Sequence, residues 1–350
     1  MYYGFDMGGT KIELAVFNEA LEPVWQKRIA TPKESYAALL EALRQLTEQA
    51  DSELGCKGKI GIGVPGIVNH EKGTVFTTNV PAAQYQPLRH DLETILQRPV
   101  KIENDANCFA LSEAWDPAFR HYPTVLGLIL GTGVGGGFVI NGTVLPGKNG
   151  IAGEIGHINM TLEGDKLLGH QVPETLCGCG KTGCFETYLS GPGFERIFTA
   201  FYGEKLSAVD IIARYYDGDH NAKLHVERYM SLLAHYLGNV LSVFDPDLLV
   251  IGGGLSQFEE IYRLLPEYLP QYLYGVASLP AIHKARYGDS GGARGAALMN
   301  PLMILVKIIK LRWIHILSYD QMVSRKINNQ TTRCANSIFY TTLFTNSAPN

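Results

Sequence analysis

The hydrophobic pattern of the first thirty residues predicts a β-meander. Short apolar or alternating runs cover residues 2–7, 12–18 and 23–29, and turn residues separate them. A period of two is typical of strands that bury one face, so the chain is expected to open with three short strands.

A helix is expected to follow the meander. Thr31 supplies a capping residue, Pro32 a proline at the first helical position and Glu34 a glutamate at the third. Apolar residues at helical spacing then form one stripe, made of Leu39, Leu40, Leu43, Leu46, Ala50 and Leu54. Further strands are expected at 59–64 and 100–103, and a helix at 106–115. Strands and helices mixed in this way predict an α/β fold.

A weak internal repeat suggests a duplicated fold. The segment Gly4–Asn18 aligns without gaps on Gly127–Asn141, and each segment has the pattern of a strand, a glycine-rich turn and a returning strand. Two such hairpins would present their glycine turns to a shared cleft. Glycines in register can also arise by chance, so duplication is a hypothesis at this point.

The second half is more helical after residue 190, with a long apolar-periodic stretch over 222–243. A buried strand is expected from Asp247, and it leads into the glycines 252–254. A last glycine cluster, 288–295, precedes a short helix that ends near Asn300.

The composition fits a soluble globular chain of 350 residues, long enough for two domains, with 46% hydrophobic and 18% charged residues. Disorder and coiled coil are poor fits. The net charge of −4 gives no general attraction to nucleic acid. The charge is uneven, because residues 301–350 hold six basic residues against Asp320, a net of +5, which leaves −9 for residues 1–300.

No run of about 18 uncharged apolar residues occurs, so no membrane span is expected. The first six residues lack the basic and apolar regions of a signal peptide, which predicts a cytoplasmic protein. Residues 301–319 are strongly apolar, but Lys307, Lys310 and Arg312 interrupt them. A basic amphipathic surface helix, a dimer contact and an atypical extension without function all remain open for residues 301–350.

Glycine turns at strand ends are candidate phosphate sites. Asp6 ends the first strand, and Gly8 and Gly9 leave room for an anion near the backbone before Thr10 and Lys11. Similar turns begin at Gly131 and at Gly252. Neither the Rossmann nor the P-loop spacing is present, and a plain glycine hairpin is the alternative, but three such turns form a stronger joint signal.

Cysteine spacing indicates a metal site. Six cysteines are too few for a disulfide scaffold, and Cys177, Cys179 and Cys184 lie within eight positions. With His157 as the fourth ligand, these residues could hold one tetrahedral zinc ion. Redox-active thiols are the alternative. Asn104 and Asp105 lie between a predicted strand and helix, where a side chain can face a cleft or cap the helix.

These residues resemble the superfamily of sugar kinases, actin and heat-shock chaperone ATPases, and within it the ROK family of sugar kinases and repressors. The motifs are the turn after Asp6, Gly153-Glu-Ile-Gly-His157, and the run from Cys177 to Glu186. The resemblance implies a two-domain, actin-like (ribonuclease H-like) α/β fold with nucleotide and sugar in the interdomain cleft. The expected parts are domain 1–117 with a closing helix near 291–300, domain 118–290 with the zinc motif, and a basic extension at 301–350.

The resemblance also assigns the site residues. Asp105 is expected to be the catalytic base, and Asp6 to lie on the magnesium side of ATP. The expected sugar ligands are Gly66, Asn79, Asn104, Asp105, Glu154, His157 and Glu186. The expected zinc ligands are His157, Cys177, Cys179 and Cys184. The expected ATP site comprises Gly4, Phe5, Asp6, Met7, Gly8, Gly9, Thr10, Lys11, Gly131, Thr132, Gly133, Val134, Gly135, Gly136, Gly137, Phe138, Val139, Ile140, Gly253 and Gly254.

The segment from Asn104 to Asp116 narrows the resemblance to amino-sugar kinases. It implies ATP-dependent phosphorylation of N-acetyl-D-glucosamine at the 6-hydroxyl, in amino-sugar salvage or cell-wall recycling, with a homodimer as an option that family members often adopt. Kinases of glucose, fructose or N-acetylmannosamine are alternatives within the family. A sugar-sensing repressor would need a helix-turn-helix domain before the first strand, and the cysteine cluster disfavours an actin-like structural ATPase.

Overall fold

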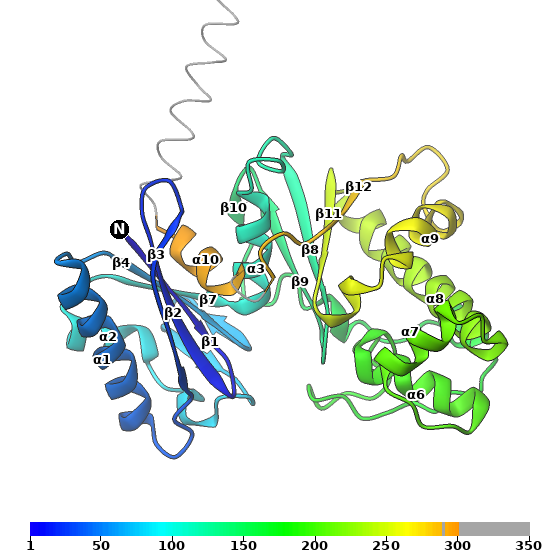
Figure 1. The fold of residues 1–350 in the computed structure, drawn as a ribbon, viewed down its shortest axis with the longest axis horizontal. Coiled ribbons are helices and arrows are strands. Elements are labelled where there is room, and N and C mark those ends of the chain that lie inside the picture. Colours follow the sequence, from blue (N-terminus) through cyan, green and yellow to red (C-terminus); the bar gives the residue numbers. More distant parts are fainter. Residues whose placement is uncertain (289–290, 301–350) are drawn as a thin grey trace, which may run out of the picture. The chain divides into compact units, whose positions relative to one another are not determined.

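A computed structural model of the chain describes residues 1–288 and 291–300 (Figure 1). Residues 1–300 form one compact unit. The extension expected at 301–350 lies outside the described residues. Within the described part, the strands form two five-stranded sheets and one two-stranded sheet.

The first sheet has the strand order β3-β2-β1-β4-β7. The hairpin β1–β2 and the pair β2–β3 are antiparallel, whereas β4 and β7 continue the sheet in parallel. The three-stranded meander is therefore confirmed. The strands are β1 (Tyr2–Met7), β2 (Lys11–Phe17), β3 (Pro23–Ala30), β4 (Lys59–Val64) and β7 (Val100–Asn104), with β5 (Ile67–Asn69) and β6 (Thr74–Phe76) forming the two-stranded sheet.

The second sheet repeats this topology with the order β10-β9-β8-β11-β12. Its hairpin β8–β9 is antiparallel and its strands β11 and β12 are parallel to β8. The segments Gly4–Asn18 and Gly127–Asn141 occupy equivalent hairpins, as the repeat predicts. The strands are β8 (Thr124–Leu130), β9 (Val134–Ile140), β10 (Thr143–Val144), β11 (Leu248–Gly252) and β12 (Ala281–Lys284).

Helices cover both sheets and build two separate cores. The α-helices are α1 (Tyr36–Leu54), α2 (Leu88–Leu96), α3 (Asp105–Ala114), α4 (Leu162–Leu167), α5 (Glu186–Leu189), α6 (Gly191–Tyr202), α7 (Ala208–Tyr216), α8 (His220–Phe244), α9 (Glu260–Tyr268) and α10 (Gly291–Leu298). Short 3₁₀ helices cover Pro81–Ala83, Ile155–His157, Gly254–Gln257 and Leu269–Tyr272. No helix among the described residues is long and apolar enough to cross a membrane.

The two predicted helix starts needed correction. Helix α1 begins at Tyr36 rather than beside Thr31, and Ser35 caps it by accepting a hydrogen bond from the Ala38 N–H at 3.1 Å. The Thr31 hydroxyl instead donates to the Gly8 carbonyl at 2.7 Å, which ties the first glycine turn to the end of β3. The cap of α3 is Asn104, and Asp105 is the first residue of the helix.

Helices α3 and α10 connect the two sheets (Figure 1). Helix α10 packs on β1, β4 and α3, and α3 packs on β8 and β9. Glycines allow this close approach: a Cβ added to Gly4 would lie 1.8 Å from the Ala293 carbonyl oxygen, and one added to Gly295 would lie 1.7 Å from the Cys108 carbonyl oxygen. The main chains of β1, α10 and α3 are therefore in direct contact.

The end of α3 also holds the segment that leads from β12 to α10. The buried Glu113 carboxylate accepts hydrogen bonds from the main-chain N–H groups of Arg286 and Tyr287, at 3.0 and 3.1 Å. The Tyr287 hydroxyl donates to Asp116 at 2.7 Å. These bonds attach the segment that follows β12 to the end of α3.

We predict that Gly295→Ala destabilises the protein strongly, because the new methyl group would overlap the main chain of α3. Overpacking of this kind commonly costs about 1–3 kcal/mol. Gly275→Ala is the matched control, because a Cβ at that exposed loop position meets no atom within 4 Å. Thermal unfolding should show a midpoint several degrees lower for the first variant only, and equal midpoints would contradict the close contact.

Candidate functional site

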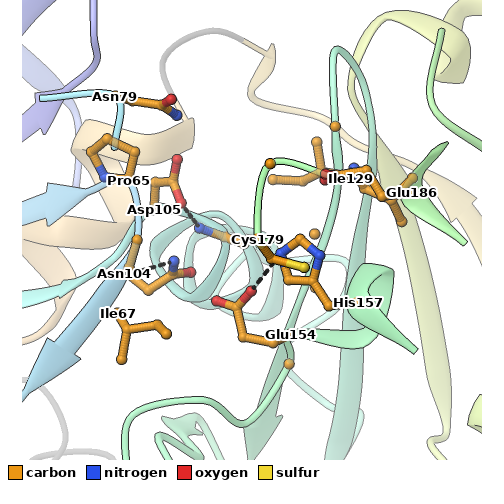
Figure 2. A pocket seen from close by; sticks show the side chains of 18 of the residues that line it. Pro65, Ile67, Asn79, Asn104, Asp105, Ile129, Glu154, His157, Cys179 and Glu186 are labelled. Carbon is orange, nitrogen blue, oxygen red and sulfur yellow. Dashed lines mark hydrogen bonds and ion pairs between the residues drawn. The ribbon is translucent and has the colours of Figure 1, made fainter. Parts of the chain in front are cut away.

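A cavity of about 670 Å³ lies at the ends of β7, β8 and β9 and is lined by both halves of the compact unit. Figure 2 shows Pro65, Asn79 and Asp105 on one side and Glu154 and His157 on the other. All the expected sugar ligands line the cavity. The lining residues include Gly66, Asn79, Asn104, Asp105, Glu154, His157 and Glu186, together with Gly131, Thr132, Gly133, Val134, Gly135 and Gly136.

The end of β7 places Asn104 and Asp105 at the cavity. Asn104 caps α3 by accepting from the Asn107 N–H at 3.1 Å, and its amide group donates to the Gly66 carbonyl at 2.9 Å. The Asp105 carboxylate accepts from the Ala106 N–H at 2.9 Å. The alternative of an ordinary helix cap therefore applies to Asn104, and the Asp105 side chain is available to the cavity.

The Asp105 carboxyl group lies in an environment that disfavours its charge. Burial raises its pKa from 3.8 to about 7, and the nearby carboxylates of Asp6 and Glu154 add to the effect. A carboxyl group with a pKa near neutrality can hold and release a proton under ordinary conditions, which suits acid–base chemistry.

Two further carboxylates and an imidazole line the cavity with Asp105, on Glu154, Glu186 and His157. Glu154 Oε2 lies 3.5 Å from His157 Nε2 (Figure 2). Burial raises the pKa of Glu154, and the charge of Glu186 contributes. Glu186 begins α5 and accepts a hydrogen bond from the Val134 N–H at 3.0 Å. Oxygens of this kind can accept hydrogen bonds from the hydroxyl groups of a polyol.

The cysteine motif and His157 form one cluster. The ligand atoms of His157, Cys177, Cys179 and Cys184 all lie within 4.8 Å of one another. Cys177 Sγ is 3.5 Å from His157 Nδ1, and Cys179 Sγ is 3.6 Å from Cys184 Sγ. This cluster could bind a metal ion. Because His157 Nδ1 faces the sulfur atoms and Nε2 faces Glu154, the cluster adjoins the cavity.

The glycine turns are placed differently from one another. The turn Gly131–Gly136 lines the cavity, and Gly253 contacts it, since a Cβ on Gly253 would lie 2.8 Å from the Gly131 nitrogen. Gly9 adjoins the cavity residue Asn79, because an added Cβ would lie 2.7 Å from the Asn79 carbonyl oxygen. Asp6 lies close to Asp105, whose pKa it raises.

Several residues expected at the ATP site have packing roles instead of lining this cavity. Phe5, Met7, Phe138 and Val139 are buried in or against the cores, and Gly4 contacts α10. Gly137 packs on the main chain of α3, and the Ile140 side chain is exposed at the far end of β9. Their assignment to ATP stays a prediction, as do those of Gly8, Thr10, Lys11 and Gly254.

The sequence pattern does not predict the apolar residues that line the cavity. Ile67 and Phe76 come from the small sheet, and Ile151 and Ile158 come from the segment that carries Glu154 and His157. Three of them, Phe76, Ile151 and Ile158, are exposed. Isolated apolar residues among glycines give no signal by periodicity, since neither a helical nor a strand pattern surrounds them.

Comparison with known proteins gives consistent matches. The profile of the ROK family matches residues 2–301. The N-acetyl-D-glucosamine kinase of Yersinia pseudotuberculosis is 58% identical over 300 residues, which cover 86% of this chain and 99% of that relative. The ROK hexokinase structure from Thermus thermophilus is 34% identical with a TM-score of 0.76, covering 87% of this chain and 98% of that one.

A second solved structure carries ligands. The ROK glucokinase of Streptomyces griseus, in complex with glucose and AMPPNP, is 27% identical with a TM-score of 0.67. The match covers 86% of this chain and 99% of that chain.

We predict that Asp105→Asn stabilises the protein at pH 8 in buffer without magnesium or nucleotide. The pKa of Asp105 is about 7 in the folded protein and has an ordinary value of 3.8 in the unfolded chain. Between pH 3.8 and pH 7 the folded protein therefore binds more protons than the unfolded chain, and its stability falls as the pH rises through this range. Asparagine keeps the bond from Ala106 and removes the charge. The thermal midpoint of the variant should exceed that of the wild type at pH 8 and match it near pH 4.

The exposed Asp217 supplies the control for this comparison. Asp217→Asn also removes one carboxylate, but from an exposed position, so it should change the thermal midpoint at pH 8 less than Asp105→Asn does. A parallel pH dependence for the wild type and Asp105→Asn would show that Asp105 is not desolvated.

Proposed function

Since this chain belongs to the ROK family, we propose that it is an ATP-dependent kinase that phosphorylates N-acetyl-D-glucosamine at the 6-hydroxyl, giving N-acetyl-D-glucosamine 6-phosphate and ADP. Its fold is that of the actin-like sugar kinases. The observation that carries the proposal is the position of Asp105, a desolvated carboxyl group in a cavity that the glycine turn at 131–136, Glu154, His157 and Glu186 also line. The identity to curated N-acetyl-D-glucosamine kinases supports the choice of sugar.

Asp105 would act as the general base. As the sugar oxygen attacks the γ-phosphorus atom, its proton passes to the Asp105 carboxylate, and the bond from the γ-phosphorus to the β–γ bridging oxygen breaks. The negative charge of that bridging oxygen leaves with ADP. A pKa near 7 leaves the carboxylate form populated at neutral pH and still able to accept a proton.

The remaining polar residues would orient the sugar. Glu154, Glu186 and the Nε2 atom of His157 line the wall that faces Asp105, where hydrogen bonds to several hydroxyl groups would hold the acceptor oxygen in place. Asn104 and Asn79 would contact the sugar from the side of the first sheet. Excluding water from the cavity matters, because water could otherwise accept the phosphoryl group.

The glycine turns would hold the ATP phosphates through main-chain N–H groups. A magnesium ion bound with ATP would neutralise phosphate charge, and Asp6 would meet it. Asp6 lies close enough to Asp105 to raise the pKa of that carboxyl group, and carboxylate oxygens are ligands that magnesium takes in proteins. Under this proposal the segments 1–117 and 118–290 would be the two domains, and α10 packs on the first sheet as a closing helix would.

The cluster of His157, Cys177, Cys179 and Cys184 fits zinc. Tetrahedral zinc with Zn–S bonds near 2.3 Å requires sulfur atoms about 3.8 Å apart. The separation of 3.6 Å between Cys179 and Cys184 agrees with that requirement. A bound zinc ion would supply structural crosslinking only, since four protein ligands would fill its coordination sphere. It would fix the imidazole of His157 for its contact with the sugar.

Hexose kinases remain the second candidate, because the ROK hexokinase and glucokinase structures match most of the chain. We predict that ADP release, measured in a coupled assay, is fastest with N-acetylglucosamine when it is compared with N-acetylmannosamine, glucose and fructose.

Asp105→Asn, run in parallel, should lose at least about 10²-fold in turnover while keeping sugar affinity. A preference for glucose would replace the proposed substrate, and near-normal turnover of the variant would refute the base.

For the cluster, we predict about one zinc ion per chain in the purified protein, measured by elemental analysis. Cys179→Ala should lose the metal and lower the thermal midpoint, because a ligand is missing. Cys56→Ala is the control, since Cys56 lies outside the cluster. Wild-type protein that is folded without metal would contradict the zinc assignment.

A further inference from the structure

Glu103 carries a buried carboxylate next to the segment that contains Asp105. It is the second-last residue of β7, precedes Asn104 and Asp105, and is only 6% exposed. It does not line the cavity, and the chemistry described above does not use it. Successive residues of a strand point to opposite faces, so the Glu103 side chain lies on the face of β7 opposite to the apolar, buried Val100 and Ile102. A buried charge at this position costs desolvation energy and requires partners.

The partners of Glu103 are the residues that shape the first turn of α3. Its Oε1 atom accepts from the Asn104 main-chain N–H at 2.8 Å and from the Asn107 side-chain amide at 3.0 Å. The Asn107 main-chain N–H in turn donates to the Asn104 side chain at 3.1 Å. These three bonds link Glu103, Asn104 and Asn107 into a closed ring, and Asp105 lies between the last two of these residues in the sequence.

The ring depends on Glu103 more than on its other members. The Asn107 amide oxygen is buried and finds no hydrogen-bond partner in the described part of the chain, so the carboxylate is the group that orients this side chain. Asn104 has a further bond to the Gly66 carbonyl at 2.9 Å, which links the ring to the cavity wall. Glu103 Oε2 is also 3.4 Å from His70 Nε2, but His70 is 38% exposed, and a contact of this kind contributes little.

We propose that Glu103 is a positioning residue for phosphoryl transfer: by holding Asn104 and Asn107, it sets the direction in which the first turn of α3 presents Asp105 to the acceptor hydroxyl. The inference rests on the proposed kinase function. Its physical basis is the sensitivity of such reactions to geometry, since a displacement of about 1 Å can reduce the rate about 10²-fold. A carboxylate that binds both the cap of α3, Asn104, and Asn107 in its first turn restrains that displacement.

Three variants test the proposal in the ADP-release assay. Glu103→Leu has a similar volume and removes both hydrogen bonds, so kcat should fall about 10²-fold while KM for ATP stays within about threefold. Glu103→Gln keeps an acceptor oxygen for Asn104 and Asn107, so it should recover most of the lost kcat. His70→Ala removes the exposed contact only and should match the wild type.

A structural role alone gives a different result. If Glu103 only stabilised the fold, Glu103→Leu would lower the thermal midpoint and the fraction of active protein. Its kcat per folded molecule and the pH midpoint of kcat would then equal the wild-type values, and this outcome would overturn the proposal. Equal kcat for the leucine and glutamine variants would also overturn it, because the hydrogen bonds would then be irrelevant.

Asn107→Ala keeps the test decisive if Glu103→Leu does not fold. This variant removes one bond of the ring, so a tenfold loss of kcat is expected, and an unchanged kcat would refute the positioning role. Failure of the kinase function itself would be visible separately, because wild-type protein would then release no ADP with any of the sugars.

Discussion

The site depends on the close main-chain contacts by which α10 and α3 join the two sheets. Helix α10 approaches both β1 and α3 so closely that Gly4 and Gly295 leave no room for a side chain. Because α3 begins at the cavity and packs on β8 and β9, its distance from both sheets determines where Asp105 lies. Separate cores could stabilise each sheet, but they could not by themselves bring Asp6, Asp105 and Glu154 together.

That convergence has an electrostatic cost. Burial and neighbouring carboxylates raise the pKa values of both Asp105 and Glu154, so the folded protein holds acidic groups in an unfavourable place. Buried hydrogen-bonded carboxylates elsewhere support the same region: Glu103 binds the start of α3, and Glu113 near its end binds the segment that leads to α10. Because hydrogen bonds hold α3 at both ends, the helix cannot easily shift to move Asp105 away from the other carboxylates. Enzymes commonly concentrate perturbed groups in this way.

Local patterns predicted much of this structure, and long-range contacts account for the rest. The strand alternation and the gapless repeat gave the two hairpins, because periodicity and glycine turns are local properties. The start of α1 was wrong, since the bond from the Thr31 hydroxyl to Gly8 competes with capping, and no local signal reveals a partner 23 residues away. The motif residues Glu154, His157 and Glu186 line one cavity, and their role as sugar ligands stays a prediction. The isolated Ile67 and Ile151 line the same cavity, but no sequence pattern marks them.

Direct contacts link the cluster of His157, Cys177, Cys179 and Cys184 to the cavity wall beside it. Cys177 and Cys184 are buried, and Glu186 follows them at the start of α5, where it bonds to the Val134 N–H in β9 beside the second glycine turn. Cys177 also donates to Glu186 at 3.2 Å, and His157 links the sulfur atoms to Glu154. Segment 177–186 contains three glycines, and apart from its cysteines it contributes the buried apolar side chain of Phe185 to the core. A metal ion held by the cluster would crosslink this segment, and a change at the cysteines would then reach the cavity residues His157 and Glu186.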